Sequence, residues 1–376
     1  MQLYFDCNAT TPMDPSVLGV VRHFLEEEYG NAGSRTHQWG SRAKQAVAGA
    51  RAHVASVVAA EPADVVFTSG ATESNNIAIL GLADTLRSHG RTHIVSTAIE
   101  HKAVLEPLER LSRQGFEIDY LSPGSDGRID VAEVSRLVRD DTGLVSVMHV
   151  NNETGVIQPV EEIGQLLEGR PTLFHVDAAQ GFGKVSGLDA AGIDLISISG
   201  HKVYAPMGVG ALVARRRGMA RPDITPLQVG GGQERGIRPG TLPVPLIAGL
   251  GEAARLALAD RESRERRCVE IKAKLLKGIA DLPHTVNGSA EDTIASTLNV
   301  AFHGVDAEAA LVCLKDIVAI SNGSACTSNS YTESHVLQAM GLPQDRIRQS
   351  LRWSWSHLTP DPPMSEVREA LKPLLA

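Results

Sequence analysis

Residues 194–202 read DLISISGHK, an apolar run that ends at Gly200 and is followed at once by a histidine and a lysine. The run is rich in isoleucine and too short for a helix, so it predicts a strand covered on both faces. An ammonium group is costly to bury, and yet Lys202 comes directly after this strand. Taken alone, Lys202 is most simply a solvated loop residue, so its role has to be judged from its surroundings.

Further apolar runs of this kind occur along the first two thirds of the chain. They are VVFTS (65–69), HIVSTA (93–98), EIDYLS (117–122), GLVSVMHV (143–150), TLFHVDAA (172–179) and GVGALVA (208–214). Stretches with helical character lie between them, such as residues 101–115 and 159–169. Strands that alternate with helices predict an α/β fold with a mostly parallel sheet.

The pattern changes near Leu242. A long helical region runs from about Pro245 to Leu282, and its second half is heavily charged. We expect this region to lead into a second, smaller domain that contains STLNVAFHG (296–304) and DIVAISNGSA (316–325).

Polar residues follow five of the predicted strands. In an open α/β sheet, ligands bind beyond the carboxyl ends of the strands. Residues 70–76, GATESNN, offer small residues, hydroxyls and free N–H groups at a helix start, which suit an anion. The other strand ends carry His101, residues 151–153, Asp177 with Gln180, and Lys202. The sequence therefore predicts one crevice that contains a phosphate site, a histidine, an amide, a carboxylate and a lysine.

This combination is what pyridoxal 5′-phosphate requires. A lysine at a desolvated strand end has a lowered pKa and can bind the cofactor's aldehyde covalently. The pyridine ring needs a carboxylate, here Asp177, that keeps its nitrogen protonated, and the phosphate needs an anion site. Each motif is weak alone, but the set predicts that Lys202 holds this cofactor.

Seven motifs together resemble one known family. They are TSGATESNN (68–76), EH (100–101), HVNNETG (149–155), HVDAAQ (175–180), SGHK (199–202), GGGQERGIRPGTL (230–242) and NGSACTS (322–328). This set resembles the pyridoxal-phosphate cysteine desulfurases of the NifS/IscS type, in the class-V aminotransferase group. The resemblance implies a fold type I transferase, a homodimer and a smaller α+β domain built from both chain ends. The implied limits are 14–258 for the large domain, and 1–13 with 259–376 for the small domain.

The resemblance also implies a role for each matched residue. Lys202 would bind the cofactor covalently, and His101 would stack on its ring and shuttle protons. The other cofactor-binding residues would be Asp177, Gln180, Asn152, Ala71, Thr72, Ser199, His201 and Thr241, the last of which would reach the phosphate in the partner subunit. The substrate L-cysteine would be bound by Arg352, Asn152 and Asn8, where the guanidinium fork suits a carboxylate. No metal site is expected.

Cys326 lies in SNGSACTSNSY (321–331), a segment of small polar residues that is typical of a loop. The resemblance implies that the Cys326 thiolate takes sulfur from L-cysteine as a persulfide and that L-alanine is released. The stretch from Cys326 to Arg352 resembles members with a long loop, so we expect a sulfur-acceptor protein. Cys268 and Cys313 lie in apolar helical stretches and are expected in the core. The role of Cys7 stays open.

Some residues depart from the general pattern of the family. Around Arg352 the chain reads RWSWSH (352–357), and Gln233 and Pro239 stand in the GGGQERGIRPGTL motif. Three roles are open for Trp353 and Trp355: they could alter the substrate entrance, alter a docking surface for a partner, or pack in the protein interior. The RWSWSH segment resembles the desulfurases of the DndA type, which serve DNA phosphorothioation.

Other functions remain open from the sequence. With the same cofactor, the chain could supply sulfur for iron–sulfur clusters or thiolation, or act as a selenocysteine lyase, a sulfinate desulfinase or an aminotransferase. A non-catalytic scaffold is disfavoured, because it would have no need for Lys202, Asp177, His101, Cys326 and Arg352 together.

The composition excludes several other classes. The 376 residues, 43% of them hydrophobic, suffice for two domains. A net charge of −8 argues against a nucleic acid or a membrane as the main partner. Four cysteines without CxxC spacing argue against a zinc ribbon or a disulfide scaffold. The first residues, MQLYFDCNATTP, lack the pattern of a signal peptide, so we expect a cytoplasmic protein.

Overall fold

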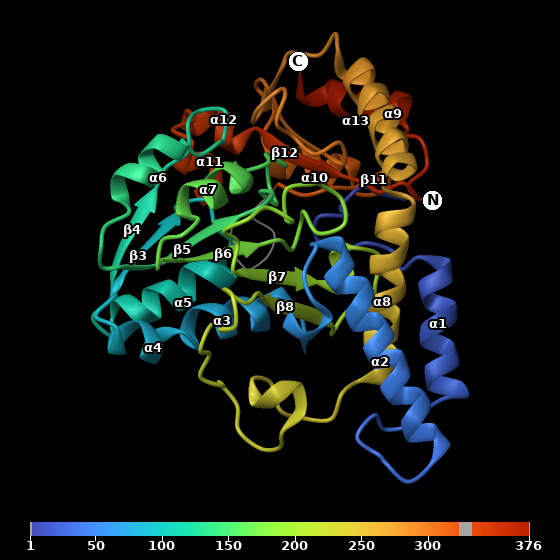
Figure 1. Ribbon diagram of the computed structural model, residues 1–376. Coiled ribbons are helices and arrows are strands. Elements are labelled where there is room, and N and C mark those ends of the chain that lie inside the picture. The colour runs from blue at the N-terminus through green and yellow to red at the C-terminus, as the bar shows by residue number, and fades with distance from the viewer. Residues whose placement is uncertain (1, 323–332, 376) are drawn as a thin grey trace.

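The computed structural model describes residues 2–322 and 333–375 (Figure 1). At its centre is a seven-stranded sheet, and its strands confirm the apolar runs predicted from the sequence. Neighbouring strands are parallel except around β8, which is antiparallel to both of its neighbours. In sheet order the strands are β2 (Val65–Thr68), β8 (Gly210–Ala214), β7 (Leu195–Ser199), β6 (Leu173–Asp177), β5 (Thr142–Met148), β3 (His93–Thr97) and β4 (Glu117–Leu121).

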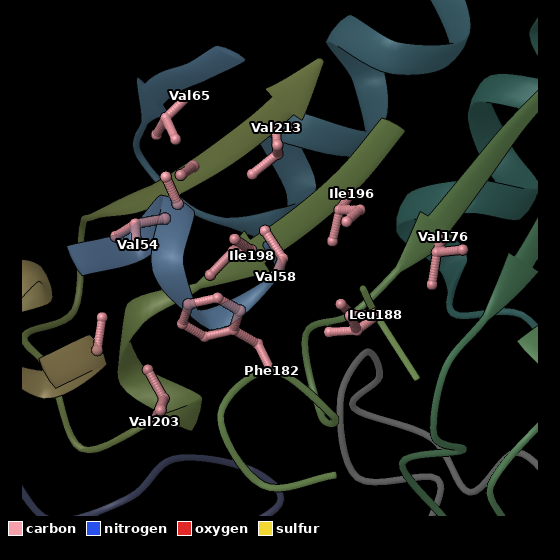
Figure 2. Packing of buried hydrophobic residues seen from close by; sticks show 14 of the residues in the cluster. Val54, Val58, Val65, Val176, Phe182, Leu188, Ile196, Ile198, Val203 and Val213 are labelled. Carbon is pink, nitrogen blue, oxygen red and sulfur yellow. The ribbon is translucent and has the colours of Figure 1, made fainter. Parts of the chain in front are cut away.

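Helices cover both faces of this sheet, which explains why most of its strands are apolar and buried. The edge strand β4 is the exception, since Glu117 and Tyr120 are exposed. In β2, for example, Val65 and Phe67 belong to one hydrophobic cluster and Val66 belongs to another. Figure 2 shows the first cluster, where Val54 and Val58 lie with residues of four strands. The helices of this face are α1 (Pro15–Glu26), α2 (Gln38–Val57), α6 (Val131–Leu137), α7 (Val160–Leu167) and α8 (Val244–Ala259). The helices of the other face are α3 (Ala71–Leu80), α4 (Ala83–Ser88) and α5 (Lys102–Ser112).

A second core lies beside this sheet and combines residues from both ends of the chain. Phe5 packs there with Trp353 and with the apolar side of α9. Its elements are the antiparallel strands β9 (His284–Asn287), β10 (Thr297–Phe302) and β12 (Ser350–Ser354), the parallel pair β1 (Leu3–Tyr4) and β11 (Val318–Ala319), and the helices α9 (Arg261–Ile279), α10 (Ala307–Leu314) and α13 (Met364–Leu371). In Figure 1 these helices gather at one end of the molecule. The domain limits given above stay a prediction.

Two further helices, α11 (His335–Ala339) and α12 (Gln344–Arg348), follow the residues that the structure does not describe. None of their residues belongs to the hydrophobic cluster of the second core. Instead, Val336 and Leu337 of α11 pack with Ile99 and Met148, which follow or end strands of the large sheet. The chain after residue 332 therefore returns first to the large sheet and only then forms β12.

Two expectations need correction. The long helical region is interrupted at Asp260, where the backbone leaves the helical conformation (φ −112°, ψ 5°), and it forms α8 and α9. Cys313 is exposed on α10 and is not a core residue, whereas Cys268 is buried as expected. The prediction for Cys313 was wrong because α10 buries only one side, through residues such as Ala307, Ala310 and Leu314. Among the described residues, no helix has the length and apolar character needed to cross a membrane.

Candidate active site

A cavity of about 430 Å³ lies at the carboxyl ends of the parallel strands. It brings together residues that follow β2 and β3, residues that end β5, β6 and β7, and residues of the N-terminal segment and of β12. The residues of the sequence prediction that line it are Asn8, Ala71, Thr72, His101, Asn152, Asp177, Gln180, Ser199, His201, Lys202 and Arg352. The predicted crevice is therefore present in the fold.

One end of the cavity is formed by the start of α3. The residue before this helix is Gly70, which has no side chain to cap the first N–H groups. These N–H groups and the helix dipole favour an anion at this end. Gly210 of β8 permits the close approach of this turn, since a Cβ there would lie 2.6 Å from the Cα of Gly70 and 2.3 Å from the Ile198 carbonyl oxygen.

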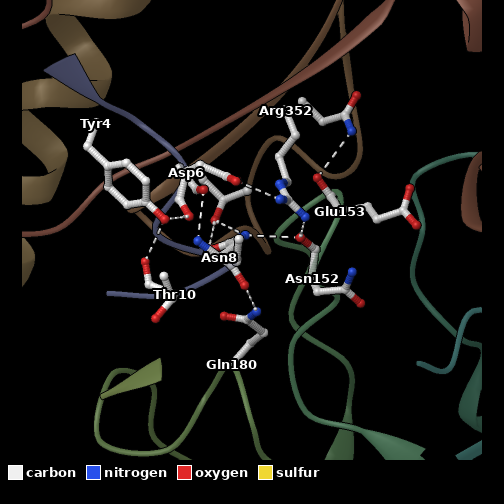
Figure 3. Close-up of polar contacts among 12 residues, drawn as sticks. Tyr4, Asp6, Asn8, Thr10, Asn152, Glu153, Gln180 and Arg352 are labelled. Carbon is white, nitrogen blue, oxygen red and sulfur yellow. Dashed lines mark hydrogen bonds and ion pairs between the residues drawn. The ribbon is translucent and has the colours of Figure 1, made fainter. Parts of the chain in front are cut away.

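Lys202 follows β7 in a short 3-10 turn, Gly200–Lys202. Its Nζ donates hydrogen bonds to the carbonyl oxygens of Asn8 (2.5 Å) and Ala9 (2.7 Å). The carbonyl of Asn8 also accepts a hydrogen bond from Gln180 Nε2 (2.9 Å), as Figure 3 shows. The N-terminal segment thus forms one wall of the cavity and holds the lysine and the amide side by side.

Asp177 ends β6 and is almost fully buried, with 5% of its surface exposed. Asn75 Nδ2 donates to its Oδ2 (2.7 Å), and the backbone N–H of Ala179 donates to its Oδ1 (2.9 Å). Among the described residues, Asp177 forms no ion pair. A buried carboxylate with only neutral donors lacks a cation, so the site has room for a positively charged ligand atom at this point.

His101 is the N-cap residue before α5, and its Nδ1 accepts a hydrogen bond from the backbone N–H of Ala103 (3.1 Å). Burial lowers the pKa of His101, and the nearby charge of Lys202 acts in the same direction, while Asp177 opposes both. The ring is therefore neutral at pH 7. Because Nδ1 accepts, the single ring proton resides on Nε2.

Glu100 precedes this histidine in the chain and has no exposed surface. Its Oε1 accepts hydrogen bonds from the backbone N–H of Met148 (2.7 Å) and from Thr97 Oγ1 (2.9 Å). Its Oε2 has no partner among the described residues. Burial, and then repulsion from Asp177, raises the pKa of Glu100 to about 8, so this carboxyl group is protonated at neutral pH.

Arg352 of β12 is nearly inaccessible, with 2% of its side chain exposed. Its guanidinium donates to Asp6 Oδ1 (2.6 Å) and to the carbonyl oxygen of Asn152 (3.1 Å), while its Nε has no partner among the described residues. Asn8 Nδ2 donates to the same carbonyl (3.1 Å), as Figure 3 shows. These contacts place the predicted substrate-binding residues in one network.

One predicted site residue lies outside the cavity, and one cannot be placed. Thr241 is exposed and lies outside the lining, in the segment before α8. Cys326 lies outside the described residues. The alternatives left open for Trp353 and Trp355 are settled: both side chains are about 1% exposed, and Trp355 Nε1 donates to the Cys268 carbonyl oxygen (3.0 Å). They pack in the second core and do not form the cavity entrance.

The sequence prediction assigned no role to Asn75, Glu100 or Asp6. A signal for Asn75 was available, because it stands four residues after Ala71 in a predicted helix and therefore on the same face. No comparable signal existed for Asp6. Its ion pair with Arg352 joins residues 346 positions apart, so it depends on the tertiary fold.

The sequence profile of the aminotransferase class-V family matches residues 3–356. The chain belongs to the class-V aminotransferase family. Among curated relatives of this family, "Cysteine desulfurase IscS" of Anaeromyxobacter dehalogenans is 46% identical over 355 residues, covering 93% of this chain and 87% of the relative. The identity to this relative and the match to the class-V profile place the chain with the cysteine desulfurases. This is the family that the sequence motifs resembled.

Two solved structures of this family resemble the chain closely. DndA from Streptomyces lividans is 56% identical, with a TM-score of 0.83, and the match covers 93% of this chain and 98% of DndA. SspA, solved in complex with cysteine, is 36% identical, with a TM-score of 0.82, and the match covers 96% of this chain and 99% of SspA. The fold is therefore that of the class-V, fold type I enzymes.

Class-V enzymes of this type depend on pyridoxal 5′-phosphate, and the cavity fits that group. The buried Asp177 carboxylate lacks a cation, as a protonated pyridine nitrogen would provide. The uncapped start of α3 suits a phosphate. Lys202 lines the same cavity and is available for covalent attachment.

Proposed function

We propose that this protein is a cysteine desulfurase in which Cys326 accepts sulfur from L-cysteine as a persulfide and L-alanine is released. The observation that carries the proposal is that Lys202, Asp177, His101 and Arg352 line one cavity in a chain from the desulfurase branch of its family. The cysteine complex of SspA supports L-cysteine as the substrate.

Arg352 would bind the carboxylate of L-cysteine. Its guanidinium carries a fork of donors, of which two now contact Asp6 and the Asn152 carbonyl oxygen. Asp6 keeps this cation oriented in the buried network, and Asn8 holds the Asn152 backbone from the other side. The carboxylate would then be fixed between Arg352 and Asn152, with the substrate's amino group directed toward Lys202.

The cofactor would be held by Lys202, by Asp177 at its ring nitrogen, by Gln180 at its phenolic oxygen, and by the start of α3 with Ser199 and His201 at its phosphate. When bound, pyridoxal 5′-phosphate supplies an electron sink for the carbanion that forms at the substrate Cα. Lys202 Nζ would accept the Cα proton, since it is the basic group in the cavity that can move between its carbonyl partners and the substrate.

His101 would donate a proton to the substrate, in addition to the Cα proton that Lys202 accepts. Its ring is neutral, and Nε2 carries the proton while the Ala103 N–H fixes Nδ1. The ring therefore has one defined orientation and can donate from Nε2 to the substrate. Burial of the ring also excludes water from this side of the cavity.

Sulfur transfer would take place at the Cys326 thiolate. The thiolate attacks the sulfur of L-cysteine, an S–S bond forms, and the C–S bond breaks. The electron pair of the C–S bond remains on the carbon skeleton and is protonated, which gives L-alanine. The products are one persulfide and one alanine for each cysteine consumed, so no external oxidant or reductant is needed.

We further propose a homodimer in which Thr241 reaches the partner subunit's site. Thr241 is exposed and outside its own cavity, so a role at the phosphate requires a second copy. Met219 and Val229, in the segment before Thr241, are about 90% exposed, which suits a surface that another protein covers. Met207, at the edge of the cavity, is 65% exposed as well.

The sulfur would pass to an acceptor protein of the cytoplasm, where thiols stay reduced. We favour DNA phosphorothioation as the pathway, because the 56% identity to DndA exceeds the identity to the IscS relative. A general role as sulfur donor for iron–sulfur clusters is the alternative that the IscS relative supports. A direct contact with DNA is not part of this proposal, given the net charge of −8.

The test compares Cys326→Ser with Cys313→Ser, which alters an exposed cysteine of α10. We expect both variants to bind the cofactor with the normal absorbance. Cys326→Ser should lose alanine formation from L-cysteine by at least about a thousandfold, because the nucleophile is removed. Cys313→Ser should keep the wild-type rate. Alanine formation at the wild-type rate in Cys326→Ser would contradict the proposal.

A further inference from the structure

A second cavity, of about 450 Å³, lies where α9 passes two other parts of the chain. One is the loop of residues 183–186, which follows β6, and the other is the segment 293–296, which precedes β10. Figure 1 shows α9 continuing from α8 toward α13, so this helix connects the two cores. None of the residues that line this cavity lines the candidate active site.

The lining of the cavity includes two lysines, Lys184 and Lys272, which are both partly buried. Within residues 2–322 and 333–375, neither ammonium group forms an ion pair. Burial lowers the pKa of Lys184 to about 8, and burial alone lowers the pKa of Lys272. The groups that oppose this shift at Lys184 are the buried thiols of Cys7 and Cys268 and not a carboxylate. Lysines withdrawn from water usually have an anionic partner, and none of the residues that the structure describes supplies one to this pair.

The other charged residues of the cavity do not supply that partner. Arg264 is already neutralised, since it donates to Asp14 (3.0 Å) and lies 3.5 Å from Asp260. Glu265 and Glu291 also line the cavity, but both are exposed and stand at its solvent side. The partly buried residues of the lining therefore carry an excess of positive charge, and its carboxylates belong to exposed residues.

The rest of the lining is largely apolar. Ile157 and Ile294 lie on one part of it, and Val269 of α9, which is 51% exposed, lies on another. A volume of this size accommodates a small organic molecule, and pockets for such ligands combine apolar walls with a few polar groups. A compound with an anionic group and an apolar body would complement both features.

This cavity is linked to the cofactor site because residues close together in the sequence line the two cavities. Tyr204, which lines it, comes two residues after Lys202 and has a left-handed backbone (φ 66°). Burial, and then the charges of Lys202 and Lys184, lower the pKa of His201 to about 4. The positive charge of Lys184 thus lowers the pKa of a residue in the active site. An anion bound to Lys184 would reduce this effect on His201.

We propose that Lys184 and Lys272 form the anion-binding end of a second ligand site, which takes a small organic anion with an apolar body at the junction of the two cores. The two ammonium groups bind the carboxylate or phosphate of this ligand, and Ile157, Ile294 and Val269 contact its body. This site is distinct from the active site and does not depend on the reaction proposed above.

The test uses the protein with its cofactor bound, so that the phosphate site of the active site is filled. Binding of octanoate, of inorganic phosphate and of the neutral analogue 1-octanol is measured by calorimetry and by the shift in unfolding temperature, against sodium chloride at equal ionic strength. The variants are Lys184→Met with Lys272→Met, and the control is Lys277→Met, an exposed lysine of α9 outside the cavity. Methionine keeps the length and the apolar part of the side chain.

We expect at least one of the two anions to bind the wild-type protein and the control equally, and 1-octanol to bind more weakly. The double variant should lose affinity for that anion by about tenfold or more, as expected for charge-assisted hydrogen bonds. Stronger binding of octanoate than of phosphate identifies a carboxylate with an apolar body, and the reverse identifies a phosphate compound. Absence of binding by both anions, equal binding to the double variant, or equal binding of 1-octanol would overturn the proposal.

Discussion

In the wild-type protein, the free energy of unfolding should fall as the pH rises from 5 to 9, because the buried Glu100 has a raised pKa. Replacement of Glu100 by glutamine should remove this fall. Glu100 is fully buried, and its pKa is raised from an ordinary value of 4.5 to about 8. Glutamine resembles the protonated carboxyl group in shape, and its side-chain oxygen can accept the same hydrogen bonds from Met148 and Thr97. The variant therefore mimics the protonated state at every pH.

The sign of the effect follows from proton binding. Between pH 4.5 and pH 8, the folded state retains the proton on Glu100 and the unfolded state has released it. Because the unfolded state binds fewer protons, the stability contributed by this group is complete below pH 4.5 and falls as the pH rises toward 8. With these two pKa values, the wild-type protein loses about 2.5 kcal/mol from this group between pH 5 and pH 7, and about 1.4 kcal/mol more between pH 7 and pH 9.

The assay is urea unfolding of wild-type protein, Glu100→Gln and the control Glu106→Gln at pH 5, 7 and 9. Glu106 is exposed on α5, so its replacement controls for a change of formal charge near the same helix. We expect Glu100→Gln to gain about 2.5 kcal/mol relative to wild type on going from pH 5 to pH 7, while Glu106→Gln follows wild type. Parallel pH dependence of wild type and Glu100→Gln across this range would refute the reasoning.

Two other changes have clear expected outcomes. Arg352→Lys keeps the charge but loses the planar fork, whose two terminal nitrogens reach Asp6 and the Asn152 carbonyl separately, so kcat/KM for alanine formation should fall about 10- to 100-fold; a change within twofold would exclude Arg352 from substrate binding. Glu234→Ala removes the buried acceptor of Arg51 and of the Phe67 N–H, and should lower the free energy of unfolding by about 3 kcal/mol. The control is Glu133→Ala, which removes an exposed carboxylate and should leave the free energy of unfolding in urea unchanged. Equal losses of stability in Glu234→Ala and Glu133→Ala would contradict the role of Glu234.

The sequence predicted the sheet and most of the cavity because both rest on local signals. The strands are short apolar runs, and the polar residues that follow them, such as Asp177 and Lys202, meet because parallel strands end at one edge. Cys313 was misplaced because an apolar stretch shows that a helix has a buried side, but it does not show which residues face solvent.

Other features depended on tertiary structure and left no local pattern. The Arg352–Asp6 ion pair joins the two ends of the chain. The burial of Trp353 and Trp355 follows from the packing of β12 against α9 and the N-terminal segment, which the motif alone did not reveal. Lys184 and Lys272 of the second cavity are 88 residues apart in sequence and line one cavity only because α9 passes the loop after β6.

The most direct test of the central claim is the mass of the peptide that contains Cys326 after the purified protein has reacted with L-cysteine. The account predicts a gain of one sulfur atom on this peptide alone, with L-alanine released in equal amount. The peptides of Cys7, Cys268 and Cys313 should keep their masses. An unmodified Cys326 peptide while alanine is formed, or the extra sulfur on another cysteine, would contradict the assignment of Cys326 as the sulfur acceptor.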